Sequence, residues 1–296
     1  MSAAPARAIP VLFVLPPRVL LLDVAGPLDA LRRANLEQDR VRFDVHYCAA
    51  RAALESSVGL GLSGIAALPD EVPDDAWIVL AGSADAVAFG ADTDPALVAG
   101  DERAIVAWLA ARVRREHRLI AICSGALLAA RAGLLDGYAC TTHHACCAAL
   151  RALAPGAKVL DDRLYVEDRA RLSSAGVTAG TDLMLHFVAR YVGPAATAAI
   201  ARHLVVYARR AGGDPQLSPW LEGRNHLHPA VHRVQDAIAA QPARAWTLAS
   251  LATVAATSPR HLSRLFNEHA GMSLPDYVNG LRVALARELL GATRLD

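Results

Sequence analysis

Residues 119–126 read Leu-Ile-Ala-Ile-Cys-Ser-Gly-Ala, and this stretch decides the fold of the first part of the chain. An apolar run ends abruptly at Cys123, and small residues then lead into a segment of helical spacing that reaches Ala132. A short apolar run before a small-residue turn and a helix is typical of a buried parallel strand that feeds a crossover helix. Cys123 is therefore expected on a tight strand-to-helix turn, a nucleophile elbow.

An elbow of this kind lifts its side chain above the sheet and directs the backbone N–H groups of Ser124 and Gly125 toward one point. The amino terminus of the following helix is expected to lower the pKa of the Cys123 thiol and to attract anionic or carbonyl oxygens. The alternative is that Cys123 is only a small buried residue, as most free cysteines are. The elbow is favoured because the strand, turn and helix signals agree.

Strand-like and helix-like segments alternate around this elbow. Strands are expected at 11–15, 41–47, 76–81, 117–122, 158–160, 164–167 and 171–173, and helices at 26–33, 101–115, 182–191 and 195–204. This alternation predicts an α/β fold with a parallel sheet sandwiched by helices. Ligands bind beyond the carboxyl ends of such strands, where Gly82 and Cys123 both fall.

The composition limits the class of protein. At 296 residues the chain is long enough for two domains, and its 30 basic and 29 acidic residues leave no strong overall field. The 5 cysteines are odd in number and irregularly spaced, which indicates a reducing cytoplasm rather than a disulfide framework. Pro16, Pro17 and Arg18 interrupt the apolar run at 11–22, so neither a signal peptide nor a membrane span is expected there.

Glycine, proline and charged residues replace the periodic pattern near residue 208, and the pattern returns near residue 228 in purely helical form. We therefore expect a front domain at 1–208, a linker at 209–227 and a small all-α domain at 228–296. Helices are expected in the last domain at 229–241, 248–255, 259–270 and 275–290.

The clearest short motif is the helix between Ser258 and Gly271. Ser258 is a good N-cap, Pro259 fits the first helical position, and Gly271 fits the position after the end. Leu262, Leu265 and Phe266 form the buried stripe, and the opposite face carries Arg260, His261, Ser263, Arg264 and Asn267. With the short helix before it, this motif predicts a helix-turn-helix whose second helix enters the DNA major groove. The alternative is a solvated polar face on an ordinary helical hairpin.

The last seventy residues resemble an AraC-type DNA-binding domain. The resemblance rests on Trp246–Ala252, Ser258–Phe266, Gly271–Ser273, Tyr277, and the run from Leu281 to Leu290. It implies DNA as a partner, with Arg260, His261, Ser263, Arg264 and Asn267 facing it. AraC-type domains contain two helix-turn-helix units, and the second unit is expected to be missing from these 296 residues.

The first two hundred residues resemble the PfpI-type, class I glutamine amidotransferase-like domain at the front of GlxA-type regulators. The matching pieces are Leu22–Pro27, Ile122–Gly125, Ala132–Gly137, Thr141–His143 and Ser174–Gly180. The resemblance implies a flavodoxin-like fold in which Cys123 is paired with Asp23, and His143 lies near the elbow. We expect these three residues to form the catalytic or, more readily, the ligand-pocket centre, with Gly82, Ser124, Gly125 and Thr178 binding the ligand.

Each of these residues also has a simpler interpretation. Asp23 reads well as a helix N-cap, and His143 as a residue that caps or packs at the start of a helix. Cys140, His143, His144, Cys146 and Cys147 suggest zinc, but their spacing fits no standard structural site. No metal and no cofactor are therefore expected.

Two classes of function follow. One is a one-component transcriptional regulator whose front domain senses a small molecule, and the other is a PfpI-type isonitrile hydratase, amidase or glyoxalase-like enzyme that uses Cys123. The attached helix-turn-helix favours the regulator, since a plain enzyme has no use for it. The resemblance suggests a small nitrogenous metabolite as effector, and paired DNA readers imply a homodimer.

Overall fold

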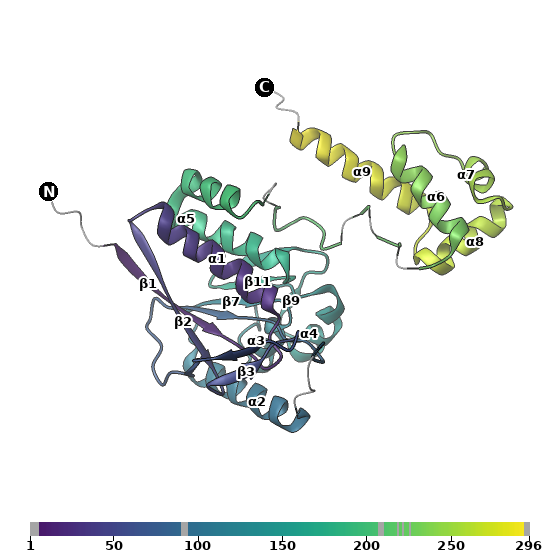
Figure 1. Cartoon of the computed structure of the whole chain (residues 1–296). Coiled ribbons are helices and arrows are strands. Elements are labelled where there is room, and N and C mark those ends of the chain that lie inside the picture. The colour runs from purple at the N-terminus through teal and green to yellow at the C-terminus, as the bar shows by residue number, and fades with distance from the viewer. Residues whose placement is uncertain are drawn as a thin grey trace. The chain divides into compact units, whose positions relative to one another are not determined.

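The computed structural model describes residues 6–89, 94–206, 210–217, 219–220, 222–224 and 226–292. The chain divides into two compact units, Met1–Gln216 and Leu217–Asp296. Figure 1 shows the whole chain, with an α/β unit first and a helical unit after it.

The first unit is built on one large sheet. Within the described residues its strand order is β10-β11-β7-β6-β1-β2-β5, and all neighbours are parallel except β10 and β11. The strands are β1 (Arg7–Val14), β2 (Val41–Ala49), β5 (Ala66–Ala67), β6 (Trp77–Leu80), β7 (Arg118–Ile122), β10 (Tyr165–Asp168) and β11 (Arg171–Ser174). Two short pairs lie outside it, β3 (Ala53–Glu55) with β4 (Gly61–Ser63), and β8 (Ala139–Cys140) with β9 (Lys158–Val159). The predicted parallel α/β sheet is confirmed, with one antiparallel strand at its edge.

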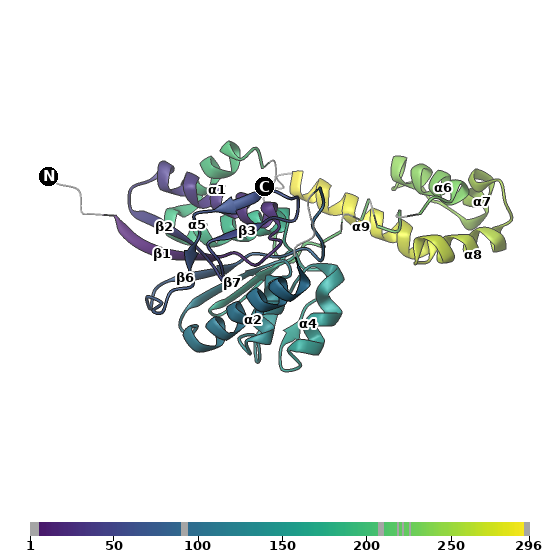
Figure 2. The ribbon, with the colours of Figure 1, turned by 60° about the horizontal axis from the view of Figure 1, so that its bottom comes forward.

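Helices cover both faces of this sheet (Figures 1 and 2). One face is covered by α1 (Leu21–Glu37) and α5 (Thr178–His203), and the other by α2 (Pro95–Arg112), α3 (Gly125–Arg131) and α4 (Cys147–Leu153). Trp77 and Phe187 join sheet and helix on the first face, with ring centroids 4.4 Å apart. Burial of such large apolar side chains, about 1.5–3 kcal/mol each, holds the layers together.

Two helices begin earlier than the sequence predicted. The first helix was expected at 26–33 with Pro27 near its start, but α1 begins at Leu21 and contains Pro27. Its first turn is held by long-range hydrogen bonds of the Asp23 carboxylate, which a local pattern does not reveal. The α2 helix was expected from residue 101 but begins at Pro95, because the Asp94 carboxylate caps it by accepting from the Ala96 N–H at 2.8 Å.

The two helices expected at 182–191 and 195–204 form the single element α5, with non-helical backbone at Gly193 just before Pro194. Its 26 residues are long and apolar enough, with a mean hydropathy of 1.2, to cross a membrane by length and composition. Leu185 and Val188 on this helix are fully buried in the core with α1 and the sheet. Packing inside the first unit therefore accounts for its apolar composition.

The first unit ends later than expected. The linker was predicted from residue 209, but residues 210–216 belong to the first unit, and we call this segment the strap. Its glycines and proline suggested a free linker, whereas its backbone and side chains form hydrogen bonds with β10, α5 and the Thr142 carbonyl. Tertiary contacts therefore override the local composition here.

The second unit is helical, as predicted. It contains α6 (Pro229–Ala240), α7 (Leu248–Ala255), α8 (Pro259–Ala270) and α9 (Leu274–Ala292). Thr247 and Ser250 form a capping box on α7, and the Ser258 hydroxyl accepts from the His261 N–H at the start of α8. Leu262, Phe266 and Leu281 are fully buried where the helices meet.

Candidate ligand site at the cysteine elbow

The strand-turn-helix expected around Cys123 is present. Strand β7 ends at Ile122, helix α3 begins at Gly125, and Cys123 between them has a φ of 55°. A positive φ is uncommon for a residue with a side chain and is often found at functional sites. Gly176 lies so close that a Cβ on it would be 2.2 Å from the Cys123 Cβ, so only glycine fits there.

Asp23 lies directly behind the thiol and is completely buried. Its Oδ1 accepts from the Val177 N–H at 2.6 Å, and its Oδ2 accepts from the Gly82 N–H at 3.2 Å. A further side-chain hydrogen bond joins it to Cys123. The N-cap interpretation of Asp23 is therefore wrong, because both carboxylate oxygens face residues far along the chain and the N-cap position is occupied by Leu20.

Burial sets the protonation of this pair. Desolvation raises the pKa of Asp23, against the lowering effect of the Val177 and Gly82 N–H groups. Burial also raises the pKa of the Cys123 thiol, and the charge of Asp23 raises it further, although the Ser124 N–H acts in the opposite direction. The expectation that the helix terminus lowers this thiol pKa is wrong, because desolvation outweighs the N–H groups. At neutral pH the thiol is protonated.

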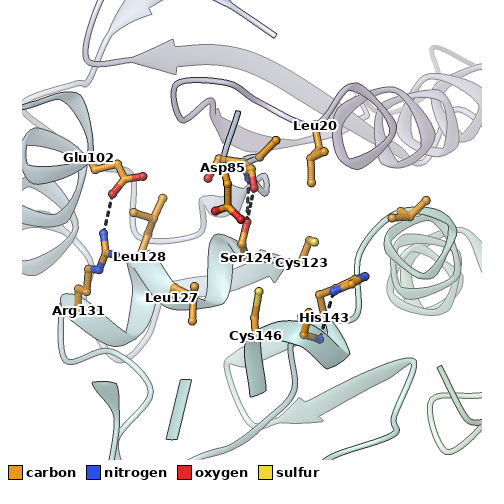
Figure 3. A pocket seen from close by; sticks show the side chains of 14 residues that line it. Leu20, Asp85, Glu102, Cys123, Ser124, Leu127, Leu128, Arg131, His143 and Cys146 are labelled. Carbon is orange, nitrogen blue, oxygen red and sulfur yellow. Dashed lines mark hydrogen bonds and ion pairs between the residues drawn. The ribbon is translucent and has the colours of Figure 1, made fainter. Parts of the chain in front are cut away.

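A cavity of about 480 Å³ opens next to the elbow (Figure 3). Its walls are Leu20, Ser83, Ala84, Asp85, Glu102, Cys123, Ser124, Leu127, Leu128, Arg131, His143, Ala145, Cys146 and Val177. Glu102 and Arg131 form an ion pair of 2.6 Å across one side, and Asp85 is exposed. The cavity thus combines an apolar lining with carboxylates and two thiols, which suits a small polar ligand.

The predicted site residues are only partly brought together. Cys123, Ser124 and His143 line the cavity, and Gly82 lies behind it against Asp23. Gly125 is buried at the start of α3, where a Cβ would be 2.6 Å from a backbone oxygen of β6. Thr178 is not one of the cavity's lining residues, and its hydroxyl accepts from the Arg210 guanidinium at 2.7 Å.

The structure agrees with both interpretations of His143, as a residue of the ligand site and as a helix cap. It lines the cavity, and its Nδ1 also accepts from the Ala145 N–H at 3.4 Å as the cap of the short 3-10 helix η1 (His144–Cys146). Burial and the neighbouring His144 lower the pKa of His143, so its ring is neutral at pH 7. A neutral imidazole can accept a proton from a ligand.

The sequence reasoning missed Asp85 and Cys146 as cavity residues. Asp85 follows Gly82 and Ser83 at the carboxyl end of β6, so the rule that ligands bind there contained a usable signal. Cys146 was noticed only as part of a possible zinc cluster. Among the residues that the structure describes, no group of three or more His, Cys, Asp and Glu side chains is placed to hold a metal ion.

Helices α7 and α8 of the second unit follow each other across a short turn, as the helix-turn-helix prediction requires. Between α7 and α8 the turn contains Ala256 in the left-handed conformation, with a φ of 53°. The residues Arg260, His261, Arg264 and Asn267 are exposed on α8, opposite its buried stripe. Arg264 contacts Glu268 at 3.6 Å and the His261 ring at 3.3 Å. Ser263 is half-buried and borders a small hollow with Trp246 and Leu248.

Four histidines gather at one end of the second unit, which the sequence analysis did not foresee. The ring of His226 lies 4.3 Å from that of His232, and the ring of His228 lies 4.5 Å from that of His269. The Nδ1 atoms of His226 and His228 both accept backbone N–H groups, which requires both atoms to be unprotonated. Burial and the neighbouring His232 lower the pKa of His226.

A mostly parallel sheet with helices on both faces, and a cysteine elbow backed by a buried acid, defines a class of α/β proteins. The DJ-1/PfpI family matches residues 10–190. The HTH-type transcriptional regulator GbdR of Pseudomonas aeruginosa is 30% identical over 290 residues, covering 96% of this chain and 74% of GbdR. The HTH-type transcriptional regulator GlxA of Rhizobium meliloti is 29% identical over 279 residues, covering 94% of this chain and 82% of GlxA.

A solved structure is similar to the first unit in fold. It is an AraC family transcriptional regulator from Pseudomonas putida, with a TM-score of 0.51 and 21% identity, covering 66% of this chain and 99% of that one. The chain therefore belongs to the DJ-1/PfpI family, among those members that are HTH-type transcriptional regulators. The resemblance inferred from the motifs is confirmed.

Proposed function

We propose that this chain is a DNA-binding transcriptional regulator whose first unit senses a small molecule in the cavity at Cys123. The observation that carries the proposal is one chain that holds both a cavity at a cysteine elbow and a capped helix-turn-helix. The matches to GbdR and GlxA support it, because they extend over 96% and 94% of the chain and so include both units.

The α8 helix is the proposed DNA reader. Its exposed face carries Arg260, Arg264 and Asn267, while the opposite stripe anchors it in the unit. Arginine pairs well with guanine edges and asparagine with adenine edges in the major groove. We assign these three residues to base contacts and His261 to phosphate. Ser263 is half-buried and would reach only the border of the interface.

The proposed effector is a small nitrogenous metabolite. Glu102 is already paired with Arg131, whereas Asp85 is exposed beside the cavity. Burial raises the pKa of the Cys146 thiol, and the negative charge of Asp85 raises it further. This arrangement favours a ligand that carries positive charge on nitrogen. Leu20, Leu127 and Val177 would contact its apolar part.

A PfpI-type enzyme is the second candidate, favoured by the hydrogen bond between Asp23 and Cys123. A carboxylic acid beside a thiol can hold or transfer a proton in addition reactions at nitrile-like or carbonyl carbons. Against it stands the raised pKa of Cys123, because the thiolate is the nucleophile. Fast turnover of isonitriles, amides or methylglyoxal that disappears in Cys123→Ala would promote this candidate.

We further propose that the protein acts as a homodimer in the cytoplasm. Two copies present two readers to one DNA site, and the second contact is then made at a high effective concentration. Light scattering at micromolar concentration tests this, with a monomer as the contradicting result.

DNA selection tests the main proposal. The full chain would be used to enrich a pool of randomised duplexes, and the enriched sequence would be titrated by fluorescence anisotropy with the wild type and with Arg264→Ala. Loss of one base contact is worth about 1–3 kcal/mol, which corresponds to roughly 5- to 150-fold weaker binding. Arg103→Ala removes an equal charge from an exposed position of α2 and serves as the control. Equal affinity of both variants, or no enrichment at all, would contradict the proposal.

A further inference from the structure

The strap, residues 210–216, lies along the outer edge of β10. The Leu164 N–H donates to the Asp214 carbonyl at 3.1 Å, and the Tyr165 N–H donates to the Gly212 carbonyl at 3.4 Å. At Gly212 a Cβ would be 2.6 Å from the Tyr165 carbonyl oxygen, so only glycine allows this approach. The strap is therefore docked onto the first unit by specific contacts.

The first residue of the strap binds the start of α5, next to one residue of the cavity lining. The Arg210 guanidinium binds the Asp182 Oδ2 at 2.6 and 2.9 Å and the Thr178 Oγ1 at 2.7 Å. Asp182 is buried, and both partners lie in the first turns of α5. Val177 immediately precedes this helix, lines the cavity and donates its N–H to Asp23. Arg210 is thus connected to the cavity wall through rigid helical backbone.

The last residue of the strap binds the segment that precedes His143. The Gln216 Nε2 donates to the Thr142 carbonyl at 2.8 Å, and the Gln216 N–H donates to the Asp162 Oδ1 at 2.8 Å. The Thr142 hydroxyl in turn donates to the Cys123 carbonyl at 2.8 Å. His143, the next residue, lines the cavity. Two hydrogen bonds therefore join Gln216 to the elbow backbone.

Gln216 is also the last residue of the first unit, and Leu217 begins the second. Its side-chain Oε1 is buried and has no hydrogen-bond partner among the described residues. An unpaired buried amide oxygen is unfavourable, so the hydrogen bonding of Gln216 is not fully satisfied in the docked strap.

We propose that the strap is the element that reports occupancy of the Cys123 cavity to the chain leading into the DNA-binding unit. The inference rests on the proposed function and names how the same site is regulated. A ligand that shifts Val177 or the segment 141–143 changes the hydrogen bonds at Arg210 or Gln216, and the docked and released strap are then populated differently. The simpler interpretation is that the strap only seals the edge of β10.

A strap that reports cavity occupancy can be distinguished from one that only seals the edge of β10, because coupling between two sites is reciprocal. If the cavity biases the strap, then weakening the strap must change the cavity by the same coupling free energy. The reporter is the rate of Cys123 alkylation by iodoacetamide in the full chain, mapped by mass spectrometry. Cys48, 2% exposed in the core, reports loss of the fold in the same sample.

The variants are Gln216→Leu and Arg210→Met, with Arg202→Met as the charge-matched control at an exposed position of α5. We expect both strap variants to change the Cys123 rate by about 5-fold or more, the lower end of typical coupling between sites, while Cys48 and the control stay unchanged. An unchanged Cys123 rate in both variants overturns the proposal.

A second measurement needs no substitution. Methyl methanethiosulfonate adds a methylthio group to the cavity cysteines of the wild type, and hydrogen exchange then reports on the strap. The amides of Ala211, Asp214 and Gln216 are hydrogen-bonded in the docked strap. We expect their exchange to change by about 5-fold on labelling, and unchanged exchange refutes the coupling. If a strap variant also increases the labelling of Cys48, the variant has lost its fold, and the hydrogen-exchange measurement alone tests the coupling.

Neither the alkylation measurement nor the hydrogen-exchange measurement uses DNA. A failure here leaves the DNA-binding role of α8 intact, and a failure of DNA selection leaves the coupling between cavity and strap measurable.

Discussion

Replacing Gly176 by alanine tests how closely the elbow is packed. Gly176 has a φ of 83°, and a Cβ there would lie 2.2 Å from the Cys123 Cβ and 2.7 Å from its Sγ. The left-handed backbone costs a non-glycine residue about 1–2 kcal/mol. Overpacking of a rigid site costs about 1–3 kcal/mol more. We therefore expect Gly176→Ala to lower the free energy of unfolding of the first unit by about 2–5 kcal/mol.

Scanning calorimetry of the full chain measures this loss. One kcal/mol shifts the Tm of a domain of this size by about 2–4 °C, so the expected decrease is about 4–20 °C. Gly133→Ala isolates the backbone cost, because Gly133 has a φ of 70° but a Cβ there would meet nothing within 4 Å. Gly61→Ala, in open space without a positive φ, is expected to change stability by less than about 0.5 kcal/mol. If Gly176→Ala and Gly133→Ala lower the Tm equally, the close packing of the elbow is refuted.

Three further predictions follow from protonation and capping. Cys146 is expected to react with iodoacetamide before Cys123, because Cys146 is half-buried while Cys123 is 4% exposed and has a strongly raised thiol pKa. Peptide mapping checks the order of labelling, and faster labelling of Cys123 would contradict the prediction. The lowered pKa of His226 means that the unfolded chain binds more protons than the folded unit, so the stability of the second unit should decrease as pH falls through about 6.5, the usual histidine value. Thermal unfolding from pH 8 to 5 measures this, and a flat profile would exclude the effect. Ser258→Ala should destabilise the second unit by about 1 kcal/mol through loss of the α8 cap, as measured in urea, whereas an unchanged midpoint would show that the cap contributes nothing.

Some features of the site were predictable because their signals are local. The apolar run before Cys123 and the helical spacing after it predicted a strand, a turn and a helix, and the structure has them at Arg118–Ile122 and Gly125–Arg131. Ser258, Pro259 and Gly271 likewise predicted both ends of α8. Caps, prolines and periodicity act over a few residues, so a single sequence is enough to find them.

Other features depend on residues that are distant in the sequence. Asp23 was recognised as a partner of Cys123 only by resemblance, and its bonds reach Gly82, 59 residues away, and Val177, 154 residues away. Asp85 and Cys146 reach the same cavity from separate loops. No local pattern indicates which of these side chains meet, because the sheet order decides it.

The sequence by itself determined that this chain has an α/β front unit with a cysteine elbow, followed by a helical unit in which Ser258 caps α8. Only the tertiary structure decided that the Cys123 thiol is protonated, because desolvation by the surrounding core outweighs the nearby N–H groups. It also decided that residues 210–216 are docked rather than free, since their partners lie on β10 and α5. Local preferences define the elements, whereas burial and long-range hydrogen bonds define the chemistry that those elements perform.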